Sequence, residues 1–382
     1  MNNPLLQLKP LGQSLWYDNI DRAQLASGQF QRLLDDDGVV GVTANPTTFE
    51  KAMSQGHAYD EQLQQLSQQH KSVKEICETL ITTDIRTVAQ ALRPIYDAAG
   101  GQDGFVSLEV SPALAADTNG TLEEARRFWR MIACPNLMIK IPATPQGIPA
   151  IQQALIEGIN VNVTLIFSLE DYRRVAEAYV SALEARVQKG QDITSVASVA
   201  SFFVSRLDVL VDSLLEKKLQ ATDDAVEQHQ LHALLGKAAI ANARLVYQAF
   251  RDIFSTPRFA VLARKGGHMQ RPLWASTSTK NPAYRDVLYA EELIGPNTVD
   301  TMPLETIENF RDHGRPHLSI ENELEQAKAH FAALEQVGIS YQQVTEQLQQ
   351  EGVHKFADSF QSMYQGTEKK EKELQAGKGT RS

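Results

Sequence analysis

The feature that most constrains the fold is the regular alternation of two kinds of segment along the 382 residues. Segments of the first kind are short, apolar and rich in β-branched residues. Segments of the second kind have the i, i+3, i+4 apolar spacing of helices packed on one side. A strand followed by a helix, repeated many times, indicates βαβ units and a parallel sheet. The strand-like segments are 14–17, 39–43, 105–109, 137–141, 161–167, 195–203, 272–277 and 298–302.

Eight such repeats match an α/β fold of the (β/α)8 TIM barrel type, and a doubly wound open sheet is the competing fold. Long helical stretches between Val39 and Phe105 and between Ser195 and Pro272 are interpreted as helical insertions. After Arg315 the pattern is purely helical, with Gly338 and Gly352 as expected helix stops. We predict a barrel catalytic domain in residues 1–315, a helical C-terminal extension packed on the barrel in 316–366, and a disordered tail in 367–382.

Composition argues against several classes of protein. There are 37 Lys and Arg residues against 47 Asp and Glu residues, and the resulting net charge of −10 disfavours a nucleic-acid or anionic-membrane binder. No run of 18 apolar residues occurs, and the first residues lack a secretory leader. Two cysteines, Cys77 and Cys134, cannot build a disulfide framework or a zinc site by themselves. We therefore expect a protein of the reducing cytoplasm that has no metal and does not enter a membrane.

Lys140 stands in the middle of the apolar segment 137–141. Burial disfavours the charged ammonium form, and a neutral amine can attack a carbonyl to form a Schiff base. Pro142 fits the end of a strand that opens into a loop, which is where barrel enzymes place their catalytic residues. The alternative is a lysine on a solvent-exposed strand end, because lysines are seldom buried.

Other polar residues interrupt or follow the strand-like segments in the same way. They are Asp18, Asn45, Glu109, Asn162 and Thr164. Asn162 and Thr164 lie two residues apart, so they share one face of their strand. Each of these residues alone is more typical of a helix cap or a turn. In a barrel, however, all of them would converge with Lys140 on one mouth.

Two segments supply candidate anion ligands. The segment 201–206 ends a strand and opens a helix with Arg206, and the segment 275–280 brings Ser276, Ser278 and Lys280. Backbone N–H groups at a helix start, hydroxyls and a cation together make a phosphate site. The alternatives are helix N-capping for the serines and a surface ion pair for Arg206.

Seven motifs that occur in family order make the chain resemble the transaldolases, including their longer bacterial subgroup. Together they run from about residue 14 to residue 302. They are Leu15-Trp-Tyr-Asp18, Gly41-Val-Thr-Ala-Asn45-Pro-Thr, Val106-Ser-Leu-Glu109-Val, Ile139-Lys140-Ile-Pro-Ala-Thr, Asn160-Val-Asn162-Val-Thr164-Leu, Ser201-Phe-Phe203-Val-Ser-Arg206 and Trp274-Ala-Ser276.

The resemblance implies a cofactor-free barrel enzyme of the pentose phosphate pathway. It would move a dihydroxyacetone unit from a ketose phosphate to an aldose phosphate. The family's pairs are sedoheptulose 7-phosphate with glyceraldehyde 3-phosphate, and fructose 6-phosphate with erythrose 4-phosphate. The sugar phosphates would be its partners, and we expect a monomer or a homodimer.

The resemblance also implies roles for single residues. Lys140 is similar to the Schiff-base lysine and Asp18 to the acid/base at the breaking C–C bond. Glu109 is similar to the group that moves protons through a water held near Thr164. The remaining implied roles are dihydroxyacetone binding by Asn45, Asn162 and Ser201, and phosphate binding by Arg206 and Ser276.

One position departs from the family pattern. Many members carry an arginine two positions after the phosphate-site serine, where this chain has Ser278, with Lys280 two residues further on. Either Lys280 takes over part of the phosphate charge or Arg206 carries more of it.

Two other functions stay open at this point. One is a fructose-6-phosphate aldolase-like enzyme, although Glu109 and Phe203 match the transferase pattern rather than the Gln and Tyr of the small aldolases. The other is a sugar-phosphate-binding barrel without catalysis.

Overall fold

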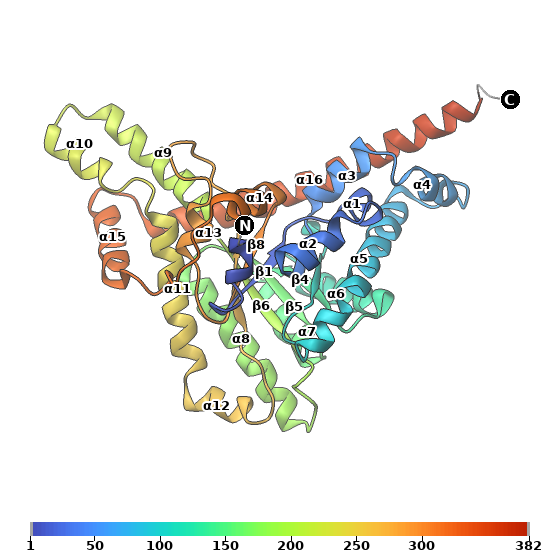
Figure 1. Cartoon of the computed structure of the whole chain (residues 1–382), viewed down its shortest axis with the longest axis horizontal. Helices are drawn as coiled ribbons and strands as arrows, with labels where there is room; N and C mark the ends of the chain where they lie inside the picture. Colours follow the sequence, from blue (N-terminus) through green and yellow to red (C-terminus); the bar gives the residue numbers. More distant parts are fainter. Residues whose placement is uncertain (1–2, 380–382) are drawn as a thin grey trace.

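Within residues 3–379, which the computed structural model describes, eight parallel strands close into one barrel in sequence order (Figure 1). The strands are Gln13–Tyr17 (β1), Val39–Thr43 (β2), Val106–Glu109 (β3), Leu137–Pro142 (β4), Val161–Ile166 (β5), Ser198–Phe203 (β6), Arg271–Ala275 (β7) and Thr298–Met302 (β8). Because β1 pairs with both β2 and β8, the sheet has no open edge. The prediction of a (β/α)8 barrel is confirmed and the open sheet is wrong, although β6 begins at Ser198 rather than at 195.

Two of the connections between strands are long and contain several helices each, as predicted. The first holds α3 (Pro46–Gln55), α4 (Asp60–Ser67) and α5 (Val73–Ala98), and the second holds α9 (Ser205–Ala221), α10 (Ala225–His232), α11 (Ala238–Phe254) and α12 (Pro257–Ala263). The remaining helices up to residue 313 are η1 (Pro4–Gln7), α1 (Arg22–Ala26), α2 (Gln29–Asp37), η2 (Pro112–Leu114), α6 (Thr118–Ile132), α7 (Gly147–Ile156), α8 (Leu169–Gln188), α13 (Leu288–Glu292) and α14 (Leu304–His313).

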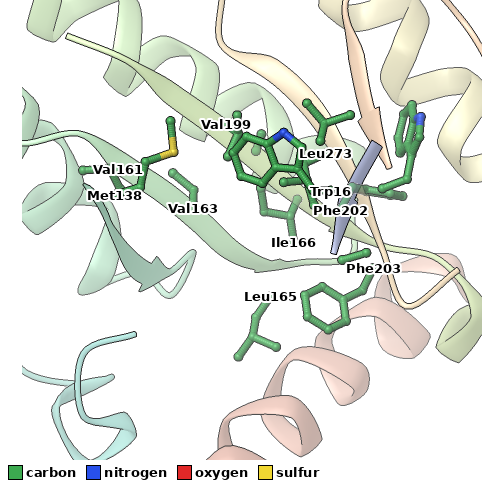
Figure 2. Packing of buried hydrophobic residues seen from close by; sticks show 14 of the residues in the cluster. Trp16, Met138, Val161, Val163, Leu165, Ile166, Val199, Phe202, Phe203 and Leu273 are labelled. Atoms are coloured by element: carbon green, nitrogen blue, oxygen red, sulfur yellow. The ribbon is translucent and has the colours of Figure 1, made fainter. Parts of the chain in front are cut away.

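The barrel interior is built in layers by residues that alternate along each strand. Trp16, Met138, Val199 and Leu273 lie in an apolar layer, all at most 2% exposed, and Figure 2 shows them among the packed hydrophobic side chains. Lys140 follows Met138 by two residues on β4, so it lies on the same face of the strand, nearer the carboxyl end. The interior is therefore a packed core at one end and polar at the other, which is the usual arrangement of an enzyme barrel.

The C-terminal extension consists of α15 (Leu324–Gln336) and α16 (Tyr341–Gly379). Figure 1 shows α16, in red, running across one end of the molecule and past α3. The predicted stop at Gly338 is confirmed, since Gly338 follows α15 with a φ of +75°. The predicted stop at Gly352 is wrong. There the missing Cβ lets α16 approach β5, and an added Cβ would lie 2.8 Å from a methyl group of Leu165.

The prediction of a disordered tail is also wrong for residues 367–379, which continue α16. Thr367 is buried and accepts a hydrogen bond from the thiol of Cys77, and the ammonium of Lys370 lies 2.8 Å from the carboxylate of Asp60. The charged composition of residues 367–379 gives no sign that one face of this helix packs against the rest of the protein. Residues 380–382 of the predicted tail lie outside the described residues.

In the part of the chain that the structure describes, no helix combines the length and apolar character needed to cross a membrane. Cys77 and Cys134 are both free thiols.

Candidate active site

Lys140 and Glu109 form a buried pair at the polar end of the barrel. They are direct neighbours in the parallel pairing of β3 with β4, and each is 5% exposed. Lys140 Nζ lies 3.4 Å from Glu109 Oε2. Burial raises the pKa of Glu109 to about 7, although the charge of Lys140 acts in the opposite direction. The exposed strand end considered for Lys140 is therefore wrong. The pair combines a buried amine with a carboxyl group that can gain or lose a proton near neutral pH.

Asn162 and Thr164 face the same interior from β5, as their spacing predicts. Asn162 pairs with Lys140 across the β4–β5 ladder and is fully buried. Its Nδ2 donates to Ser107 Oγ at 2.9 Å, and its Oδ1 accepts from Ser201 Oγ at 2.6 Å. A chain of hydrogen bonds from β3 to β6 thus fixes the amide beside Lys140.

Thr164 and Glu109 both keep unused hydrogen-bonding capacity. Thr164 Oγ1 is buried and has no hydrogen-bond partner in the part of the chain that the structure describes. Glu109 Oε2 is also buried, and it meets only Lys140 Nζ, at 3.4 Å. Buried polar atoms without partners are costly, so they usually mark a place where water or a ligand group binds.

Asp18 is held at the mouth by residues from two other strands. Its Oδ1 accepts a hydrogen bond from Thr43 Oγ1 at 2.7 Å and a longer one from Asn45 Nδ2 at 3.4 Å. Thr43 Oγ1 in turn lies 2.7 Å from Thr301 Oγ1. The turn-or-cap interpretation of Asp18 is wrong, because Asp21 caps α1 instead. Asp18 also lines a pocket of about 410 Å³, together with Thr48 and Lys51 of α3.

Asn45 does serve as a helix cap, and the cap aims its amide. Asn45 Oδ1 accepts from the backbone N–H of Thr48 and so begins α3. This leaves Nδ2 pointing to Asp18. Asn45 can therefore cap α3 and still serve the candidate active site.

The residue that precedes Arg206, Ser205, is joined to Ser276 where β6 and β7 end. The backbone N–H of Ser205 donates to the carbonyl of Ser276 at 3.1 Å, and their hydroxyl oxygens lie 3.0 Å apart. Ser276 has a φ of +58° and caps no helix. The N-capping alternative is therefore wrong for Ser276.

Arg206 sits over an aromatic ring and has no acidic partner. Its guanidinium carbon lies 5.2 Å from the centre of the Phe203 ring. Among the side chains described, it forms no ion pair, so the surface ion pair considered from sequence is wrong. Burial lowers the pKa of Arg206, opposed by the charges of Glu351 and Asp18. An unpaired, half-buried guanidinium is suited to an anionic ligand.

Lys280 is not part of this arrangement. It is exposed, and its ammonium donates to Ser278 Oγ at 2.6 Å. Its loop belongs to the segment that follows β7, but no hydrogen bond or ion pair joins it to Arg206 or Ser276.

Four residues near the site were missed by sequence reasoning. Ser107 could have been found from its position two residues before Glu109, on the same strand face. Thr43 stands in one of the quoted motifs, but Thr301 gave no signal. Phe356 of α16 places its ring centre 5.5 Å from Lys140 Nζ, and only the folded chain brings these two residues together.

Residues 15–367 match the family described as Transaldolase/Fructose-6-phosphate aldolase. A protein named "Transaldolase" from Thermobifida fusca is 49% identical, over 95% of this chain and 97% of its own length. One of the same name from Trichodesmium erythraeum is 45% identical, over 98% and 99%. "Transaldolase 2" of Streptomyces coelicolor is 44% identical, over 99% and 100%.

Proposed function

Because the chain belongs to the transaldolase/fructose-6-phosphate aldolase family and has the activity of a transaldolase, we propose that Lys140 carries the reaction as a Schiff base. The general role of such an enzyme is in the pentose phosphate pathway. The observation that carries the proposal is the buried Lys140 amine, 3.4 Å from a carboxyl group with a pKa near 7. A nucleophilic lysine needs a nearby group that moves protons while water is lost and regained.

The donor ketose reacts first. The Lys140 amine attacks its carbonyl carbon, Glu109 supplies the proton that lets water leave, and an iminium forms. Asp18 then takes the proton from the hydroxyl next to the bond that breaks, and the aldose leaves. The three-carbon fragment stays on Lys140 as an enamine, because the iminium nitrogen accepts the electron pair. The acceptor aldose reacts by the same steps in reverse.

The other residues bind and orient the sugar. Asn162, fixed by Ser107 and Ser201, faces the dihydroxyacetone unit, and Asn45 lies against Asp18. We assign the water used in dehydration to Glu109 and Thr164, since Thr164 Oγ1 has no hydrogen-bond partner and Glu109 Oε2 meets only Lys140 Nζ, at 3.4 Å. The reaction needs no metal or cofactor.

Phosphate binding is assigned to Arg206 and Ser276, and the exposed Lys280, bonded to Ser278, is the alternative cation. Since the protein has a net charge of −10, an anionic substrate must be held by local charge. Arg206→Ala should raise KM for both sugar phosphates far more than Lys280→Ala. Equal effects would mean that Lys280 replaces the family's arginine.

The substrates follow the family. The donor and acceptor pairs are sedoheptulose 7-phosphate with glyceraldehyde 3-phosphate, and fructose 6-phosphate with erythrose 4-phosphate. A cytoplasmic location and a monomeric or homodimeric state remain predictions.

Borohydride reduction in the presence of fructose 6-phosphate, followed by intact-mass measurement, tests the proposal. We expect one three-carbon adduct per chain, located on Lys140 by peptide mapping. Lys140→Ala should lose the adduct and the activity, whereas Lys189→Ala, at an exposed lysine, should keep both. Transfer activity in Lys140→Ala would refute the Schiff base at this residue.

The need for an acceptor distinguishes a transaldolase from the aldolase alternative. Glyceraldehyde 3-phosphate release from fructose 6-phosphate that proceeds at the same rate without erythrose 4-phosphate would favour an aldolase. Release that depends on erythrose 4-phosphate supports the transferase.

A further inference from the structure

Helix α16 is attached to the barrel mouth at two points that lie ten residues apart along the helix. Gln349 Nε2 donates to the carbonyl of Ala143 at 3.1 Å and to that of Leu165 at 3.4 Å, just beyond the active-site residues of β4 and β5. Ten residues later, Ser359 Oγ lies 2.8 Å from Thr47 Oγ1, two residues after Asn45. Figure 2 shows Leu165 and Phe203 pointing toward this helix, drawn in pale red.

Phe356 lies between these two attachments and faces the reacting nitrogen. It is 6% exposed, and its ring centre is 5.5 Å from Lys140 Nζ. An ordinary core phenylalanine packs on aliphatic or aromatic neighbours, whereas this ring lies against a buried lysine nitrogen. The face of an aromatic ring attracts positive charge, and this attraction is strengthened where water is excluded. An iminium formed on the same nitrogen would lie against the same ring.

We infer that Phe356 is a specificity-determining residue that keeps the carried three-carbon unit for transfer instead of release; the inference rests on the proposed Schiff-base function. Two fates compete for the enamine. In transfer, its carbon bonds to the aldehyde carbon of the acceptor, whose oxygen takes a proton. In release, the same carbon takes a proton from water or an acid, and water then cleaves the iminium to free dihydroxyacetone and the Lys140 amine. The ring limits the water that reaches the enamine, so it slows release.

The experiment measures free dihydroxyacetone released per acceptor molecule converted, with fructose 6-phosphate and erythrose 4-phosphate as substrates. Phe356→Ala opens space beside Lys140, and Phe356→Leu keeps an apolar side chain without the ring. His354→Ala, at an exposed residue of the same helix, is the matched control. We expect the ratio to rise by about tenfold in Phe356→Ala, less in Phe356→Leu, and not at all in His354→Ala.

A merely structural role of Phe356 predicts a different result. Transfer and release would then fall together, and the ratio would stay as in the unmodified protein; this outcome in either folded variant overturns the inference. Borohydride trapping of the unmodified protein keeps the two proposals apart. No adduct on Lys140 refutes the Schiff base itself, whereas an adduct with an unchanged ratio in Phe356→Ala refutes only the role of Phe356.

Discussion

Ending the chain after Gly366 removes the last part of α16 and should destabilise the protein without removing any active-site residue. The truncation deletes Thr367, Lys370 and Leu374, which lie on one face of the helix. Gln349 and Phe356 remain. From its charged composition alone, the segment would be expected to be disordered, and its removal would not change stability. The experiment therefore distinguishes that expectation from the docked helix seen in the structure.

The expected loss can be worked out from the contacts of the deleted face. The ion pair of Lys370 with Asp60, whose side chains are 12% and 21% exposed, contributes about 0.2–1 kcal/mol. The ammonium of Lys370 also donates to the carbonyls of Met53 and Gly56, at about 1 kcal/mol each. The partly buried Leu374 adds about 1 kcal/mol. These contacts add up to about 3–4 kcal/mol, which is an upper limit on the loss because the freed backbone regains conformational entropy.

Urea denaturation followed by circular dichroism measures this loss. A chain ending after Ala376 keeps all three side chains and serves as the control. Transfer activity per folded molecule should be unchanged in both truncations at low temperature. If the chain ending after Gly366 unfolds at the same urea concentration as the full chain, the end of α16 is not docked and the reasoning is refuted.

Three further predictions concern single residues. Glu109→Gln should lower kcat by about 10²–10⁴-fold and remove a limb of the pH–rate profile near pH 7; a variant that keeps this limb shows that another group titrates there. Burial raises the pKa of Asp300 to about 7, so the folded state binds more protons than the unfolded state between about pH 4 and 7, and stability falls as pH rises through that window. Asp300→Asn should therefore gain stability relative to the unmodified protein in urea at pH 8 but not at pH 4, by at most about 4 kcal/mol, and equal gains at both pH values would contradict the assignment. Gly41→Ala would place a Cβ 2.4 Å from the buried ring of Trp16 and should cost about 1–3 kcal/mol in urea, whereas Gly56→Ala, which meets nothing closer than 3.7 Å, should cost much less.

The barrel could be predicted from sequence because its strands are buried on both faces. Such strands appear as short continuous apolar segments, so a lysine within one of them, Lys140, stands out. The barrel then requires the carboxyl ends of all strands to meet, which is why Asp18, Glu109 and Asn162 were expected beside it. The catalytic candidates could thus be predicted from the local sequence pattern together with the rule that strand ends meet at one mouth of a barrel.

The supporting residues were not accessible in this way. Serine and threonine are ordinary strand residues, and only the strand register and the closed barrel make Thr43 meet Thr301 and Ser107 meet Asn162. Phe356 belongs to an apolar stripe that looks like any core-facing helix. Its contact with Lys140 depends on packing between segments more than 200 residues apart, which no periodicity encodes.

Because α16 follows all eight strands in the sequence, the order of synthesis matters for the site. All eight strands, and with them Lys140 and Glu109, precede residue 303, whereas the helix that covers them comes last. Its contacts with α3, such as the Thr47–Ser359 hydroxyl pair, close a loop of 312 residues. Because domains fold as the chain emerges, a barrel can form with its reactive lysine uncovered before the covering helix is made. The site is therefore complete only after α16 has been synthesised.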